Sequence, residues 1–120
     1  KRSKLVVTSA ILLTTSLSAF IDEVISTFAE TQADIIEKGV REHPELGVGS
    51  NSEGVDVKTV GNTQTLKETA LIEAFNLKAA IEYSMKNISA AREALMDMPP
   101  RNEDELDPVT LHNTALMNIE

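Results

Sequence analysis

The stretch that most constrains the fold is residues 69–117, where three helical patterns are separated by two well-marked boundaries. A tight turn at Lys86-Asn87 joins the first two patterns, and the second ends at Pro99-Pro100, because proline cannot donate a backbone hydrogen bond. The third opens at Asp107-Pro108, since aspartate caps free amides and proline suits the first helical position. The layout repeats after roughly 34 residues, which predicts a helical hairpin followed by the first helix of another.

Apolar residues recur at three-and-four spacing along these patterns, as expected for helices with one buried face. The stripe of the first helix consists of Leu71, Phe75, Ile81 and Met85. Ala79 and Ala80 interrupt it, and small residues let a neighbouring helix approach closely, so we expect both alanines to lie in helix contacts. Hairpins at this period are typical of tetratricopeptide arrays, which bind other proteins. The predicted fold is all-α, with tetratricopeptide-type helical hairpin repeats forming a fragment of an α-solenoid.

The predicted organisation divides the chain at about residue 33. Residues 1–33 form a divergent apolar and helical segment, and residues 34–120 form a partial tetratricopeptide region. Within that region we expect a loop at about 42–65, the helical hairpin at about 66–98, and the helix of the next repeat from about 108. The loop contains Gly47, Gly49, Gly54 and Gly61 without a sustained period, and loops of this length are usually functional or mobile.

The first segment contains an uncharged run at residues 5–21 that follows three basic residues. This run resembles a secretory signal, but it is short of the ~20 residues needed to span a membrane. A buried helix is the simplest alternative. From Phe20 onward helical spacing predicts a helix to about Lys38 that stops at Gly39 or shortly after, before the His43-Pro44 pair. The chain starts without Met and ends inside a helical pattern, so we expect a fragment.

Composition argues against several classes of function. The net charge of -8 and the pI near 4.7 repel phosphate backbones and anionic lipids, so neither nucleic acid nor a membrane is the expected partner. No residue is assigned a catalytic role, and no metal, cofactor or small-molecule ligand is expected, since the two histidines lie far apart and there is no cysteine. The acidic cluster lacks the pattern of a calcium loop and is expected to be a solvated loop with a capping aspartate; it comprises Glu103, Asp104, Glu105 and Asp107.

Several runs, in predicted loops and at helix boundaries as well as in helices, resemble the tetratricopeptide repeat protein 30 (fleer) family over about residues 34–120. The runs are His43-Pro44-Glu45-Leu46-Gly47, Glu73-Ala74-Phe75-Asn76-Leu77-Lys78-Ala79-Ala80-Ile81-Glu82-Tyr83, Asp97-Met98-Pro99-Pro100-Arg101 and Asp107-Pro108-Val109-Thr110-Leu111-His112-Asn113. The resemblance implies a subunit of intraflagellar transport complex B, a helical superhelix that encloses a proline-rich segment of a partner subunit. It also implies roles in anterograde transport, in cilium assembly and in polyglutamylation of axonemal tubulin.

The expected function is therefore a non-enzymatic scaffold that binds other complex B subunits in the cilium, on the cytoplasmic side. Peptide binding by a helical array suits polar side chains set among small ones, and the candidate partner-binding residues are Asn76, Lys78, Asn113 and Asn118. Two alternatives stay open. One is a secreted or membrane-anchored small helical protein that uses residues 5–21 as a targeting segment, and the other is a non-functional truncated copy.

Overall fold

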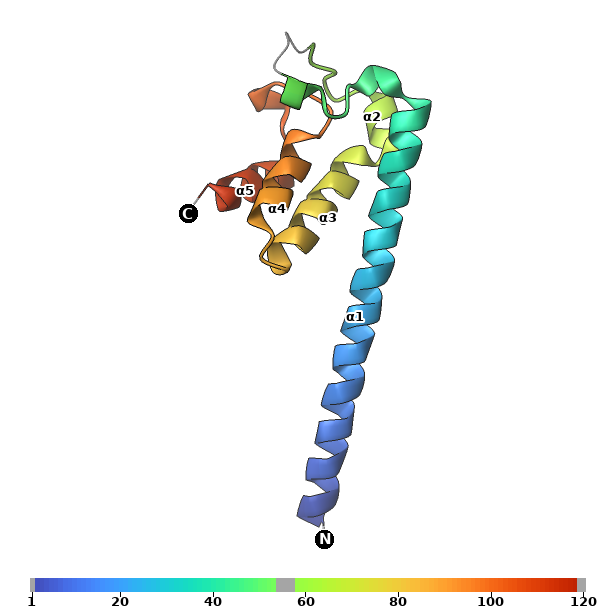
Figure 1. Cartoon of the computed structure of the whole chain (residues 1–120), viewed down its shortest axis with the longest axis vertical. Helices are drawn as coiled ribbons and strands as arrows, with labels where there is room; N and C mark the ends of the chain where they lie inside the picture. The colour runs from blue at the N-terminus through green and yellow to red at the C-terminus, as the bar shows by residue number, and fades with distance from the viewer. Residues whose placement is uncertain (1, 54–57, 119–120) are drawn as a thin grey trace.

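The computed structural model describes residues 2–53 and 58–118 (Figure 1), and every regular element in this part of the chain is helical. This confirms the predicted all-α fold with a tetratricopeptide-type hairpin. A long helix runs along one side, and the other helices gather beside its C-terminal end. In chain order the elements are α1 (Arg2–Glu42), the short 3-10 turns η1 (Pro44–Leu46) and η2 (Ser50–Glu53), α2 (Gln64–Thr69), α3 (Leu71–Ser84), α4 (Ile88–Met96), η3 (Glu103–Glu105) and α5 (Pro108–Met117).

Helix α3 is the centre of the fold, because it packs against α1, α4 and α5. Its residues Leu71, Phe75 and Ala79 are almost completely buried, as the apolar stripe predicts. Ala94 of α4 and Met98 just beyond that helix complete the middle of the core. Helix α4 is further tied to α5 by Arg92, whose guanidinium donates to the carbonyl oxygen of Met117 over 2.7 Å. The three helices of the repeat pattern therefore share one core.

The helix boundaries follow from local chemistry at the predicted positions. Asp107 caps α5, since its Oδ2 accepts from the amide of Thr110 over 3.0 Å, and Pro108 takes the first helical position; both predictions are confirmed. The turn between α3 and α4 has Lys86 in the left-handed region, with φ of 65°. The amide of Asn87 then donates to the carbonyl oxygen of Glu82 over 2.9 Å, the closure typical of a helix that ends in this conformation.

Helix α1 ends at Glu42, shortly after Gly39 and directly before His43-Pro44, which is within the predicted bounds, but Gly39 itself does not end the helix. Gly39 lies instead where α1 and α3 meet, and a Cβ at this position would be 2.6 Å from Cδ2 of Leu71. The glycine therefore permits close approach of two helices. Helix α1 runs through residue 33 without a break, and the division of the chain there stays a prediction. The described residues contain no helix with the length and apolar character needed to cross a membrane.

Two features of the hairpin differ from the sequence expectation. The first helix is split into α2 and α3 at Ala70, which has a left-handed φ of 56°; alanine rarely adopts this conformation, so no sequence signal marks the break. Ala80 and Met85 are exposed, whereas Ala79 is fully buried. The helix contact along α3 therefore uses one of the two alanines.

The described part of the glycine-containing loop is attached to the hairpin. The amide of Gly49 donates to the carbonyl oxygen of Asp97 over 2.8 Å, and that of Val60 donates to the carbonyl oxygen of Pro100 over 2.9 Å. Leu46 is buried in the core, and Val48 packs against it. These two backbone hydrogen bonds, to Asp97 and to Pro100, hold the stretch around Pro99-Pro100 in place. They therefore fix the start of the segment that leads to α5.

Replacing Gly39 with alanine is expected to lower the free energy of unfolding by about 1 to 2 kcal/mol, measured by chemical denaturation. Overpacking against the buried Leu71 destabilises the protein by more than the higher helix propensity of alanine stabilises it. In a Leu71→Ala background the same change should cost less, because the clashing side chain is gone. A Gly39→Ala protein at least as stable as the original would show that the two helices can move apart.

Replacing Ala79 with leucine is expected to destabilise the protein by about 1 to 3 kcal/mol, because no space remains around this fully buried position. The matched control is Ala80→Leu on the exposed side of the same helix, which should change stability by less than about 0.5 kcal/mol. Thermal melting followed by circular dichroism checks both. Equal melting temperatures for the two variants would contradict the packing described for α3.

Candidate partner-binding groove

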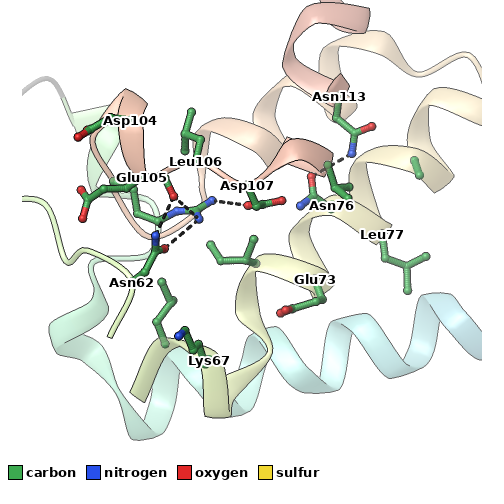
Figure 2. A pocket seen from close by; sticks show the side chains of 15 residues that line it. Asn62, Lys67, Glu73, Asn76, Leu77, Asp104, Glu105, Leu106, Asp107 and Asn113 are labelled. Carbon is green, nitrogen blue, oxygen red and sulfur yellow. Dashed lines mark hydrogen bonds and ion pairs between the residues drawn. The ribbon is translucent and has the colours of Figure 1, made fainter. Parts of the chain in front are cut away.

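A groove of about 900 Å³ lies between α3, α5 and the segment that joins α4 to α5 (Figure 2). Its apolar lining comes from residues on all of these elements and on α2, namely Leu66, Ile72, Leu77, Ala80, Leu106 and Val109. Val109 is 57% exposed, so the lining faces solvent. Because α3 and α5 are the first helices of two successive repeats, the groove lies on the face that first helices form together.

A buried asparagine joins the two first helices beside this groove. The amide nitrogen of Asn76 donates to the hydroxyl of Thr110 over 2.9 Å, and these residues lie 34 positions apart. They therefore occupy the same position in successive repeats. The side-chain oxygen of Asn76 accepts from the amide nitrogen of Asn113, also over 2.9 Å. With both ends of the Asn76 amide engaged, the spacing of α3 and α5 is fixed at this point.

The wall opposite α3 is organised by Arg101, whose side chain is only 3% exposed. Its guanidinium lies 3.1 Å from Oδ1 of Asp107 and 3.3 Å from Oδ1 of Asn62. The side-chain amide nitrogen of Asn62 in turn donates to the carbonyl oxygen of Glu105 over 2.9 Å. Buried charges are stable only when they are paired in this way. Arg101 thus anchors the loop before α2, the η3 turn and the start of α5 to one another.

Comparisons with known proteins give the family of most of the chain. No protein-family model matches it. Over 88 residues, which are 73% of this chain, it is 74% identical to intraflagellar transport protein 70A of Xenopus tropicalis. Over 88 residues the chain is also 72% identical to intraflagellar transport protein 70A of Danio rerio and 69% identical to intraflagellar transport protein 70B of Homo sapiens.

Over this segment the chain is homologous to members of the intraflagellar transport protein 70 family. This is the tetratricopeptide repeat protein 30 family under another name, so the resemblance found in the sequence is confirmed. The chain spans 14% of the length of the frog relative and 13% of the human one. The groove therefore lies within the part of the chain that resembles two neighbouring tetratricopeptide repeats.

The structure brings together two of the four residues predicted to bind a partner. Asn76 and Asn113 both line the groove, but Asn76 is buried and already bonded, which leaves Asn113 as the more available amide. Lys78 is half-buried and lies outside the groove lining, and Asn118 is exposed at the end of α5. A role of these residues in partner binding stays a prediction.

Neither the apolar lining nor Arg101 was predicted from the sequence. Leu77 and Val109 flank the predicted stripes, and the period of roughly 34 residues would have placed their helices side by side. For Arg101 the nearby Asp107 was the one local signal, since its other partner, Asn62, is distant in sequence. Within the described ranges no group of histidine and acidic side chains is arranged to hold a metal ion.

The carboxylate of Asp107, at the start of α5, carries a shifted pKa. Partial burial raises the pKa, but hydrogen bonds from the amide and hydroxyl of Thr110 and from Arg101 outweigh it, so the pKa lies below the ordinary aspartate value. The ionised form is therefore stabilised by folding. Its contribution to stability is present above the unfolded pKa and is lost as the pH falls through the lower, folded pKa.

Replacing Asp107 with alanine is expected to lower the free energy of unfolding by about 2 kcal/mol or more at neutral pH, because the helix cap is lost and the buried Arg101 loses its charged partner. The difference from the original protein should begin to shrink as the pH falls below the ordinary aspartate pKa of about 4, and should go on shrinking until the carboxylate is protonated in the folded protein, below its lowered pKa. Urea denaturation across this pH range measures it, with the exposed Asp104→Ala as the control of equal charge change. A difference that does not vary with pH would contradict the assigned role of the carboxylate.

Proposed function

We propose that this chain is a non-enzymatic scaffold element of intraflagellar transport. The support is the identity of 69% to 74% over 88 residues to proteins named intraflagellar transport protein 70. The apolar groove between two first helices is the observation that carries the binding role. Helical repeat arrays use such shared faces to hold extended segments of other proteins.

The chemistry of the groove suits an extended peptide. Leu77, Leu106 and Val109 provide apolar surface, and the side-chain oxygen and remaining N–H of Asn113 can bond to a peptide backbone, since one N–H already goes to Asn76. A proline-rich segment fits these conditions well. It stays extended at low entropic cost, and its ring nitrogens need no acceptor from the groove.

The proposed partners are other subunits of intraflagellar transport complex B, including one that contributes a proline-rich segment. The proposed setting is the cilium, with roles in anterograde transport, in cilium assembly and in the polyglutamylation of axonemal tubulin. These roles rest on the family and are extended to this chain by its high identity to the relatives. The groove is the surface through which the chain would take part.

The test is capture of complex B subunits by the full chain from ciliated cells, read by mass spectrometry, together with the location of a fluorescent fusion. Ala80→Trp places a large side chain at an exposed position of the groove, and Ser89→Trp makes a similar change at an exposed position of α4 that does not line it. The original and the Ser89 variant should recover the subunits and enter cilia, whereas the Ala80 variant should recover at least about tenfold less.

Matched melting temperatures for the two variants would show that the loss reflects the groove rather than unfolding. Equal recovery by all three proteins would remove the groove from the binding role. Failure of the original chain to recover any complex B subunit, with the fusion absent from cilia, would overturn the scaffold proposal itself.

A further inference from the structure

We propose that the segment held in the groove carries a basic side chain next to its apolar residues. This inference rests on the proposed function, because it concerns the chemistry of the peptide that the same groove would bind. It follows from the charged groups that line the groove and from which of them are already neutralised inside the protein.

Six charged side chains line the groove, and two of them cancel. Arg101 is buried and pairs with Asp107 at 3.1 Å, so neither contributes a net charge to a ligand. The other four are Lys67, Glu73, Asp104 and Glu105. Three acidic groups against one basic group leave the groove with a net negative charge, in the same sense as the charge of -8 for the whole chain.

Two of the acidic groups are available to a ligand. Glu105 is held in place, since its Oε1 accepts from the amide of Asn102 over 2.9 Å. Glu73 and Asp104 are exposed and form no ion pair within the described residues. In Figure 2 Asp104 lies at the η3 end of the groove, while Glu73 projects from α3 on the same side as Asn76.

Of the two available acidic groups, Glu73 is the one on the same helix as Asn76, because it precedes Asn76 by three residues and shares a helix face with it. A peptide whose backbone bonds to Asn113 and whose apolar side chain contacts Leu77 would bring a neighbouring lysine or arginine close to Glu73. An acidic side chain at that place would instead meet like charge. Ion pairs at exposed positions contribute modestly to affinity, but they discriminate between partners and raise the association rate.

The test uses three short fluorescein-labelled peptides in which leucine and proline alternate around two variable positions. The variable positions hold lysine, serine or glutamate, and binding to the full chain is followed by fluorescence anisotropy at low salt. The lysine peptide should bind about two- to fivefold more tightly than the serine peptide, and the glutamate peptide more weakly still. The differences should fade at about 1 M salt, where charges are screened.

Two charge-reversal variants show whether the preference arises in the groove. Glu73→Lys should remove the preference for the lysine peptide or reverse it. Glu93→Lys makes the same change at an exposed position of α4 outside the groove lining and should keep the preference. Loss of the preference in both variants would show that it reflects the net charge of the chain, which would overturn the assignment to Glu73.

The outcomes separate this inference from the proposed function. Equal binding of all three peptides, abolished by Ala80→Trp and retained by Ser89→Trp, would keep the groove as the binding surface and overturn the basic side chain. Absence of binding by every peptide would count against the groove as a peptide site, and the inference would fall with it.

Discussion

The burial of one line of side chains on α3 holds this structure together. Leu71, Phe75 and Ala79 contact the interior from successive turns of a single helix, and α1, α4 and α5 all pack against that helix. A helix that packs against several neighbours needs small side chains at the points where those neighbours approach most closely. Gly39 on α1 and Ala79 on α3 meet that requirement, so the positions of the outer helices depend on residues with little or no side chain.

Polar contacts then fix the relative positions of the helices, which apolar packing alone leaves adjustable. Apolar surfaces can slide past one another at low cost, whereas a buried amide must keep its partners. The bonds of Asn76 to Thr110 and Asn113 set α5 against α3. Arg101 sets the segment between α4 and α5 against the start of α5 through Asp107, and against the loop before α2 through Asn62. The groove is therefore bounded by groups whose places are determined within the protein.

Much of this fold is local in origin, and that part could be predicted from the sequence. The apolar stripe of α3, the stop before Pro99-Pro100 and the cap at Asp107 each depend on residues within a few positions of one another. The packing role of Gly39 could not be predicted, because a glycine can end a helix or admit a neighbouring one, and the sequence alone does not distinguish these two roles. The left-handed Ala70 and the contacts of Arg101 depend on tertiary partners. Asn76 and Asn113 were selected as candidates, but their bond to each other was not foreseen.

The bond between Asn76 and Thr110 has a consequence for the energetics of recognition. Because each residue holds the other at the same place in successive repeats, the two helices cannot change their separation without exposing an unpaired buried amide. A protein surface that is already ordered loses little conformational entropy when it is occupied. The cost of association then falls almost entirely on the incoming chain, which favours segments that are stiff before they arrive.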